Sequence, residues 1–333
     1  MRCVVNVVYA VRSAIRNNAL EIRFVLRNTK YYFRNKMVQI INGRNIADEI
    51  QNTLRCDINA WVKTSGRKPS LVAVLVGDDP ASIKYVEKKM EAAAYVGIDS
   101  KIEKLPDTIS EVELISKIQQ LNGDVSVDGI LVQLPVPPQI SERNVCNAVD
   151  PIKDVDGFHY SNAGKLCLNM ESFVPCTVLA VIEVLKRAGV ETFAKNVVVV
   201  GRSKHIGLPL SVILNSDARN ELPGLEATVT VCHRNTPPEQ LCIFTKLADI
   251  IISATGVVHL IKEDMVKPGA CVIDVGMTRI TTAEGKVRLV GDVDFDNVKN
   301  VAECITPVPG GVGPVTVAML MKNTFKAAKM HVS

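Results

Sequence analysis

The chain has 333 residues, of which 47% are hydrophobic and 22% are charged, a composition typical of globular proteins. This length allows two domains of ordinary size, each large enough to bury its own core. No apolar run is long enough to span a bilayer, so we expect no membrane partner. The nine cysteines form no C-x-x-C pair and the five histidines form no H-E-x-x-H pair, which argues against a disulfide framework and a catalytic zinc site.

The net charge of +4 is concentrated at the N-terminus. Residues 1–36 hold eight basic residues and one acidic residue, a charge of +7 that leaves −3 for the remaining chain. We therefore expect no nucleic-acid partner, because the basic excess is confined to a terminal segment. An arginine-rich, acid-poor segment resembles a mitochondrial transit peptide, which predicts location in the mitochondrial matrix. The alternative is that Met37 is the true start.

From residue 40 onwards, stretches with helical and strand periodicity alternate. The first series is predicted as helix Ile46–Val62, strand Leu71–Val76, helix Pro80–Tyr95, strand Lys101–Lys104, helix Glu111–Leu121 and strand Gly129–Leu134. Asp79 is suited to be the N-cap of the second helix, and Pro80 suits its first turn. Strands that alternate with helices of this length indicate a parallel sheet with right-handed crossovers.

A second series follows a helix predicted at Thr177–Ala188. Its elements are strand Asn196–Val200, helix Leu208–Leu214, strand Ala227–Cys232, helix Glu239–Leu247, strand Ile250–Ser253 and strand Cys271–Val275. This order is typical of a dinucleotide-binding domain. The final helix, Val315–Lys329, is long enough to pack back on the first domain. The Gly- and Pro-rich stretch 307–314 before it is predicted to be a loop that crosses the cleft between domains.

The predicted fold class is therefore α/β, with an N-terminal α/β catalytic domain, a Rossmann-like dinucleotide-binding domain and the active-site cleft between them. We place the transit-like segment at residues 1–36 and the catalytic domain at residues 37–180, completed by the C-terminal helix 310–333. The dinucleotide-binding domain is predicted at residues 181–309.

The turn Gly201-Arg202-Ser203 follows a strand of four valines and leads into a helix. The amides and dipole at a helix N-terminus suit the pyrophosphate of a nicotinamide dinucleotide. An ordinary tight turn is the alternative, because Ser203 replaces the second glycine of G-x-G-x-x-G. After the next strand, where an NAD enzyme usually carries an acidic residue, this chain has Arg234. With Arg202 it favours a nearby phosphate group, as in NADP, unless both are ordinary surface arginines.

Tyr85 and Lys89 are four residues apart on a predicted helix, so their side chains project from one face. The apolar stripe of that helix is predicted to face elsewhere, which leaves the pair available to a cleft. A lysine in a poorly hydrated pocket has a lowered pKa and can act as a base or polarise water. A solvated surface pair is the alternative interpretation.

Two polar segments fit the same site. Gln133 lies at the carboxyl edge of the predicted first sheet, where ligands bind in open α/β folds. The acidic loop Asp150–Phe158 is suited to binding the amino and ring N–H donors of a heterocycle. It lacks the spacing and final glutamate of a calcium-binding EF-hand.

Five segments, taken together, resemble the methylenetetrahydrofolate dehydrogenase/cyclohydrolase family. They are Tyr85-x-x-x-Lys89, D-G-I-L-V-Q-L-P at 128–135, K-D-V-D-G at 153–157, G-R-S-x-x-x-G-x-P at 201–209 and P-G-G-V-G-P at 309–314. The resemblance spans residues 38–330 in order, and the chain is too short for an additional formyltetrahydrofolate synthetase domain. The leader and Arg234 make it most similar to the mitochondrial, bifunctional, NAD-dependent branch.

The resemblance implies a role for each matching residue. Lys89 is expected to be the catalytic lysine, Tyr85 to stack on or orient the folate, and Gln133 to tune the lysine. Asp156 is expected to anchor the pterin. The folate pocket is expected to be lined by Tyr85, Lys89, Val132, Gln133, Leu134, Asp156, Pro309, Gly310, Gly311, Val312 and Gly313. The dinucleotide is expected to contact Gly201, Arg202, Ser203, Ile206, Arg234, Thr255 and Gly256.

In the NAD-dependent branch, Arg202, Arg234 and Glu226 are expected to hold an inorganic phosphate, assisted by Mg²⁺, in the place of the NADP 2′-phosphate. The Mg²⁺ ligands are not assigned. Three positions depart from the family pattern: Val178 stands where Pro is frequent, Val315 where Met is common, and Glu226 where this branch has Asp. The longer Glu226 side chain bears on how the ions are held.

The implied function is oxidation of 5,10-methylenetetrahydrofolate to 5,10-methenyltetrahydrofolate with NAD, followed by hydrolysis to 10-formyltetrahydrofolate in one-carbon metabolism. The resemblance also implies a homodimer and tetrahydrofolate derivatives as ligands. Alternatives are the same reactions with NADP, a dehydrogenase of another small substrate such as shikimate, and a catalytically silent NAD-binding regulator.

Overall fold

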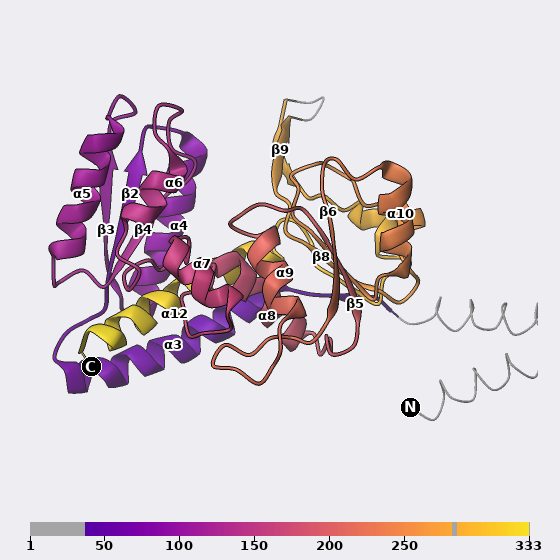
Figure 1. The fold of residues 1–333 in the computed structure, drawn as a ribbon, viewed down its shortest axis with the longest axis horizontal. Helices are drawn as coiled ribbons and strands as arrows, with labels where there is room; N and C mark the ends of the chain where they lie inside the picture. The colour runs from indigo at the N-terminus through magenta and orange to yellow at the C-terminus, as the bar shows by residue number, and fades with distance from the viewer. Residues whose placement is uncertain (1–36, 282–284, 333) are drawn as a thin grey trace, which may run out of the picture.

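The computed structural model describes residues 37–281 and 285–332, which form two α/β units, each built on its own parallel sheet (Figure 1). The predicted transit-like segment, residues 1–36, lies outside the described residues. The predicted α/β class with parallel sheets is confirmed.

The first sheet has the strand order β3-β2-β4. Its strands are β2 (Ser70–Val76), β3 (Asp99–Leu105) and β4 (Gly129–Val132). The helices in this part of the chain are α3 (Gly43–Ser65), α4 (Pro80–Val96), α5 (Glu111–Gly123), α6 (Glu142–Ala148), α7 (Tyr160–Cys167) and α8 (Cys176–Arg187). Asp79 caps α4 as predicted, since its carboxylate accepts a hydrogen bond from the Ser82 amide at 2.8 Å.

The second sheet has the order β1-β11-β8-β7-β5-β6, and all its strands are parallel. The strands are β1 (Gln39–Ile40), β5 (Asn196–Val200), β6 (Thr228–Cys232), β7 (Ile250–Ser253), β8 (Cys271–Asp274) and β11 (Cys304–Ile305). The helical elements are α9 (Gly207–Asn215), α10 (Pro238–Leu247), η1 (Glu263–Met265) and α11 (Phe295–Val298). A separate antiparallel pair, β9 (Thr278–Thr281) and β10 (Val287–Val290), projects from this unit.

The last helix, α12 (Val312–Val332), returns from the second unit to the first. In Figure 1 it lies alongside α3, although the two are at opposite ends of the sequence. Asn323 joins it to the first unit, because its amide donates to the backbone oxygens of Val155 and Val174 at 2.8 and 3.1 Å. Helix α12 therefore packs on elements of the first unit.

Several boundaries differ from the predictions. The stretch 307–314 was predicted to be entirely loop, but α12 already begins at Val312. Pro314 is compatible with this because a proline in the first turn loses no helical hydrogen bond. β4 ends at Val132, two residues before the predicted Leu134. Strands β1, β9, β10 and β11 were not predicted. β1 and β11 have only two residues each, and β9 and β10 lack the continuous buried apolar run that marks β7.

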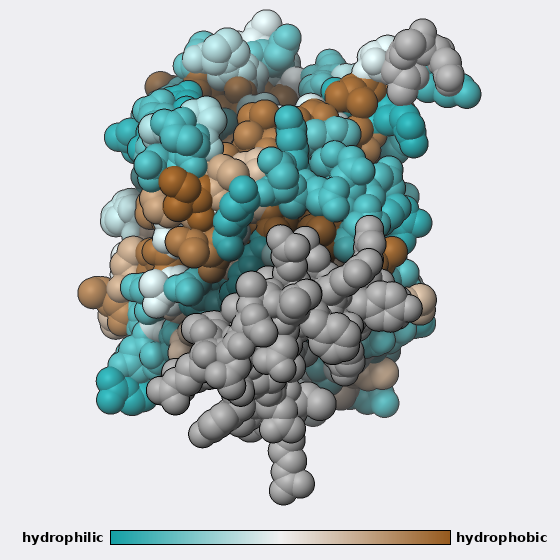
Figure 2. Space-filling view, turned by 90° about the vertical axis from the view of Figure 1, so that its right-hand side faces the viewer, coloured by the Kyte–Doolittle hydropathy of each residue, from teal (hydrophilic) through white to brown (hydrophobic). Residues whose placement is uncertain are grey.

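Among the described residues, no helix is long and apolar enough to cross a membrane. Figure 2 shows apolar groups interspersed with hydrophilic ones on the face turned toward the viewer. This mixture is what an ordinary protein surface presents to water.

Candidate active site

The second sheet contains a topological switch point at β5. The connection through α9 leads to β6 on one side of β5, and the connection through α10 returns the chain to β7 on its other side. In open α/β sheets, ligands bind at the carboxyl ends of the strands at such a point. The predicted cofactor turns at 201–203 and 255–256 follow β5 and β7, so the fold brings them together at this position.

The turn after β5 requires glycine at two positions. Gly201 has φ +124°, and a Cβ there would lie 2.4 Å from the Ala254 carbonyl oxygen after β7. A Cβ on Gly207 would lie 2.2 Å from the Gly201 oxygen. Ser203 stands in place of a second glycine, and its hydroxyl accepts from the Ile206 and Gly207 amides at 3.2 and 3.3 Å. The backbone is therefore held close to the start of α9, as a pyrophosphate cradle requires.

Arg202 and Arg234 follow the carboxyl ends of two neighbouring strands, β5 and β6. Val200 and Cys232 are register partners on β5 and β6, and each arginine follows two residues later. Both side chains are exposed, and neither makes a hydrogen bond or ion pair with the described residues. The two guanidinium groups are thus available to an anion.

Glu226, the third residue predicted to hold phosphate, lies elsewhere. Glu226 precedes β6, whereas Arg234 follows that strand. The five residues of β6 span roughly 16 Å, so Glu226 and Arg234 lie near opposite ends of the strand. Its carboxylate accepts from the Ala218 amide at 3.1 Å. The structure therefore does not bring Glu226 to the two arginines, because the intervening segment is a strand rather than a turn.

The lysine site is built on α4 and the end of β4. Lys89 is only 7% exposed, and its Nζ donates to Gln133 Oε1 at 3.0 Å. The same Nζ lies 4.7 Å from the centre of the Tyr85 ring. The Gln133 amide also donates to the Leu134 carbonyl oxygen at 2.6 Å, which fixes its orientation. The interpretation of Tyr85 and Lys89 as a solvated surface pair is therefore excluded.

Burial shifts the pKa of every titratable group in this site. It lowers the pKa of Lys89, although the nearby Asp156 charge opposes the shift. It raises the pKa of Tyr85 to about 12 and that of Asp156 to about 6, the latter despite the attraction of Lys89. Lys89 is thus closer than an ordinary lysine to the neutral form that can accept a proton.

The two aspartates Asp154 and Asp156 of the acidic loop have different surroundings: one is bonded within the loop, and the other lies in the lysine site. Asp154 is buried, and its oxygens accept from the Phe158 and His159 amides and the Asn162 side chain at 3.2, 2.8 and 2.9 Å. These bonds occupy Asp154 and shape the loop. Asp156 instead lies near Lys89 and Tyr85, and a small hollow lined partly by Asp156 and Val132 adjoins it.

Sequence reasoning did not identify Cys176 as part of this site. The thiol is buried at the start of α8 and donates to the Val155 carbonyl oxygen at 3.3 Å. Its pKa is raised well above the usual value by burial and by Asp156, while Lys89 opposes the shift. The only sequence signal is its position after Pro175, at a predicted helix start.

The predicted substrate loop packs against the start of α3. The Gly43 amide donates to the Gly310 oxygen at 2.9 Å, and a Cβ on Gly43 would lie 1.7 Å from the Gly311 oxygen. Gly310 has φ +108°, a conformation that favours glycine. Val312 and Gly313 already belong to α12, so the loop proper ends at Gly311.

The two halves of the site meet through one aromatic contact. The Phe158 and His205 rings lie 4.2 Å apart between centroids, tilted by 33°. Phe158 is two residues beyond Asp156, and His205 belongs to the dinucleotide turn. Burial lowers the pKa of His205, so the neutral ring is favoured at this junction.

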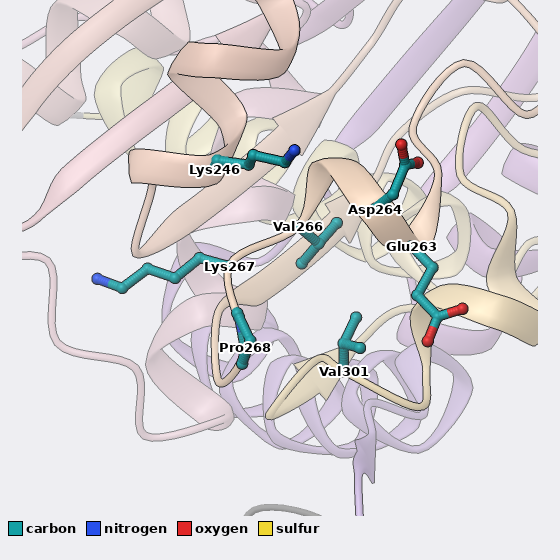
Figure 3. Close-up of a pocket in the computed structure, with 7 residues that line it drawn as sticks. All are labelled: Lys246, Glu263, Asp264, Val266, Lys267, Pro268 and Val301. Atoms are coloured by element: carbon teal, nitrogen blue, oxygen red, sulfur yellow. The ribbon is translucent and has the colours of Figure 1, made fainter. Parts of the chain in front are cut away.

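A surface pocket of about 570 Å³ lies away from these residues (Figure 3). It is lined by Lys246, Glu263, Asp264, Val266, Lys267, Pro268 and Val301, which precede β7, β8 and β11. It therefore lies at the amino edge of the sheet, opposite the switch point. Lys267 points away from the acidic pair in Figure 3 and forms an ion pair with Asp249 at 2.7 Å.

Within the described ranges, no cluster of three or more His, Cys, Asp or Glu side chains is arranged to hold a metal ion.

Comparison with known proteins places both units in one family. Residues 41–156 match the catalytic domain of tetrahydrofolate dehydrogenase/cyclohydrolase, and residues 175–332 match its NAD(P)-binding domain. The mouse bifunctional methylenetetrahydrofolate dehydrogenase/cyclohydrolase 2, mitochondrial, is 54% identical over 291 residues, covering 87% of this chain and 86% of that protein. A mitochondrial bifunctional relative from Drosophila melanogaster is 51% identical over 298 residues, covering 89% and 96% respectively.

Solved structures agree. A 5,10-methylenetetrahydrofolate dehydrogenase from the silkworm Bombyx mori has a TM-score of 0.84 at 52% identity, covering 88% of this chain and 99% of that one. The bifunctional enzyme FolD from Campylobacter jejuni has a TM-score of 0.81 at 41% identity, covering 88% and 99%. Since both units match in sequence and in structure, the chain belongs to the tetrahydrofolate dehydrogenase/cyclohydrolase family of enzymes, with a nicotinamide-cofactor-binding domain as its second unit.

Proposed function

We propose that this protein oxidises 5,10-methylenetetrahydrofolate to the methenyl form and hydrolyses that product to 10-formyltetrahydrofolate, as part of one-carbon metabolism in the mitochondrial matrix. One observation carries the proposal: a buried Lys89, bonded to Gln133 and close to Asp156, is linked to the dinucleotide turn through Phe158 and His205. The names of the mouse and fly relatives describe both activities and a mitochondrial location, which supports the same function here.

In the first reaction the chain's residues bind and align. Asp156, when ionised, accepts hydrogen bonds from the amino and ring N–H groups of the pterin, and Tyr85 stacks on or orients the folate. The loop Pro309–Gly311 and the start of α12 close the pocket. A bound nicotinamide supplies the acceptor for the hydride that leaves the methylene bridge, and alignment accounts for most of the acceleration.

In the second reaction water adds to the carbon of the methenyl cation. Lys89 in its neutral form accepts a proton from that water, and Gln133 Oε1 holds the amine in place. The bond from this carbon to N5 then breaks as the added hydroxyl gives up its proton to become the formyl oxygen and N5 takes up a proton, so the formyl group stays on N10. The proton that Lys89 accepted is released to solvent, so the step consumes one water and requires no further reactant.

We propose NAD as the working cofactor, with an inorganic phosphate between Arg202 and Arg234 in the position of the NADP 2′-phosphate. The exposure of both arginines, each placed just after the carboxyl end of one of two neighbouring strands, supports this proposal. We also propose that Mg²⁺ helps to hold the phosphate. Glu226 lies at the other end of β6 from Arg234, so it is not expected to bind a Mg²⁺ ion placed beside the two arginines. We further propose a homodimer.

Steady-state kinetics with NAD and NADP, each with and without phosphate and Mg²⁺, test the cofactor assignment. We expect NAD activity to rise with phosphate and to lose this response in Arg234→Ser. A strong preference for NADP with no phosphate activation would contradict the assignment and favour NADP as the working cofactor.

The methenyl chromophore separates this function from two different ones. A dehydrogenase of another small substrate, such as shikimate, would produce no folate-dependent spectral change, and a silent NAD-binding regulator would produce no turnover. Family membership and the intact Tyr85, Lys89, Gln133 and Asp156 set argue against both.

A further inference from the structure

Two buried carboxyl groups lie at the carboxyl edge of the second sheet, at the ends of β8 and β7. Asp274 ends β8 and is 3% exposed, and Asp292 follows β10 and is fully buried. Asp274 accepts from the Asp292 amide at 3.0 Å and from the Val293 amide at 2.9 Å. Burial and the Asp292 charge raise the pKa of Asp274 to about 7. The backbone of residues 292–293 is therefore fixed on the end of β8.

The side chain of Asp292 organises the end of β7. Its Oδ2 accepts from the Ser253 hydroxyl at 2.8 Å, the Thr255 amide at 2.7 Å and the Thr255 hydroxyl at 2.8 Å. Thr255 Oγ1 in turn accepts from the Val257 amide at 3.1 Å. One carboxylate oxygen thus sets the conformation of the whole turn at Thr255 and Gly256, which we expect to contact the dinucleotide.

Two glycines make room for this arrangement. A Cβ on Gly276 would lie 1.9 Å from Asp292 Oδ1, and one on Gly291 would lie 1.9 Å from Asp274 Oδ2. Asp292 Oδ1 is buried without a hydrogen-bond partner among the described residues.

The backbone at the end of β8 also contacts the segment that precedes the predicted substrate loop. The Thr306 hydroxyl accepts from the Asp274 amide at 2.7 Å, and Val308 lies 2.9 Å from the Cβ position of Gly291. Val308 directly precedes the loop Pro309–Gly311. These contacts involve the backbone of Asp274 and the position of Gly291, whereas the hydrogen bonds of the Asp292 side chain go to Ser253 and Thr255.

Topology assigns the turn at Thr255 to one end of the cofactor. With the pyrophosphate at Gly201 and the adenosine ribose toward Arg234 after β6, the nicotinamide extends to the other side of β5, over the end of β7. We propose that Asp292, seated on Asp274, is a positioning residue that holds the turn at Thr255 and Gly256 against the nicotinamide half of the dinucleotide and so aligns hydride transfer. This inference rests on the proposed function, and the hydrolysis at Lys89 does not require Asp292.

The two reactions supply an internal control. In Asp292→Asn we expect KM for NAD to rise or dehydrogenase kcat to fall by about tenfold or more, because bonds to a charged acceptor are weakened. The hydrolysis of added methenyltetrahydrofolate by the same preparation should change less than about twofold. Asp128→Asn is a matched control: it alters a buried carboxylate bonded to Arg67 and Ser70 in the first unit, and should leave the ratio of the two activities unchanged.

Thr255→Val and Thr255→Ser test the same contact if Asp292→Asn fails to fold. The valine variant lacks the hydroxyl that donates to Asp292 and accepts from Val257, whereas serine keeps it. We expect the affinity for NADH, measured by fluorescence titration, to fall in the valine variant and to be retained in the serine variant. Parallel loss of both activities, or unchanged NAD kinetics, would overturn the inference. A parent protein without either folate reaction would instead overturn the proposed function.

Discussion

Lys89 is a residue whose chemistry depends on neighbours distant in the sequence. Gln133 lies 44 positions away and holds its amine, and Asp156 and Cys176 lie further along the chain. Together they surround a buried amine whose pKa is lowered by its burial. This environment explains why one lysine on an amphipathic helix differs from its exposed neighbours.

We expect Lys89→Met to abolish hydrolysis, with a loss of about 10²- to 10⁴-fold, because a positioned base contributes roughly that much. Decay of the methenyl chromophore measures this reaction directly. Lys88→Met is the matched control, since Lys88 is exposed on the same helix and should behave like the parent. Full hydrolase activity in the Lys89 variant would refute the assignment.

The raised pKa of Asp156 leads us to expect that folate binding depends on pH. Burial raises its pKa to about 6, so the ionised form, which we propose accepts hydrogen bonds from the pterin, is present above this pH and is lost below it. KM for folate should therefore rise as pH falls through about 6, by roughly tenfold for each unit further. In Asp156→Asn, KM should be high and independent of pH over this range. An unchanged pH profile in the variant would assign the titration to another group.

At the scale of elements, the contact between α3 and the substrate loop is the tightest in the site. Gly43→Ala would place a Cβ 1.7 Å from the Gly311 oxygen, so either the loop or the helix start must move. We expect KM for folate to rise by about tenfold, since a displacement of about 1 Å is costly in catalytic geometry.

Gly164→Ala is the control for this change. Gly164 lies in α7 with nothing within 4 Å of its Cβ position, so alanine should be neutral or slightly stabilising. Equal KM values in the two variants, measured by initial rates, would show that the loop does not line the folate pocket.

The prediction of elements from the sequence succeeded where a continuous apolar run or a capping residue marked the element. β5 and β7 have the predicted bounds, and α4 begins at Pro80 with Asp79 as its cap. Short elements and the join at Val312 were missed, because a two-residue strand or a proline-containing first turn has no periodic signature. The order of the strands was likewise outside the reach of local pattern.

At the scale of the molecule, the chain passes from the first unit to the second and returns through α12. The ring of Phe325 on this helix packs edge-on against Trp61 of α3, with centroids 5.7 Å apart. Trp61 is the single tryptophan of the chain, so its fluorescence reports on this return. The first unit is therefore stabilised by residues more than 250 positions away in sequence.

We expect Phe325→Ala to lower the free energy of unfolding by about 3 kcal/mol, because it removes a buried aromatic ring. Urea unfolding followed by Trp61 fluorescence measures the change. Met330→Ala, at a position that is 46% exposed on the same helix, should shift stability by less than about 0.5 kcal/mol. Equal midpoints in the two variants would contradict the role assigned to α12.

The sequence alone determined the fold class, most of the long helices and strands, and the family, because periodicity, caps and the five motifs are local properties of the chain. Only the tertiary structure decided that Cys176 joins Lys89 and Asp156, that Glu226 lies at the opposite edge from Arg234, and that Asp292 supports Thr255. The physical reason is that a pKa shift depends on which residues exclude water from the group, and a buried hydrogen bond depends on which partner lies within reach. The fold, and not the distance in sequence, brings these residues into contact.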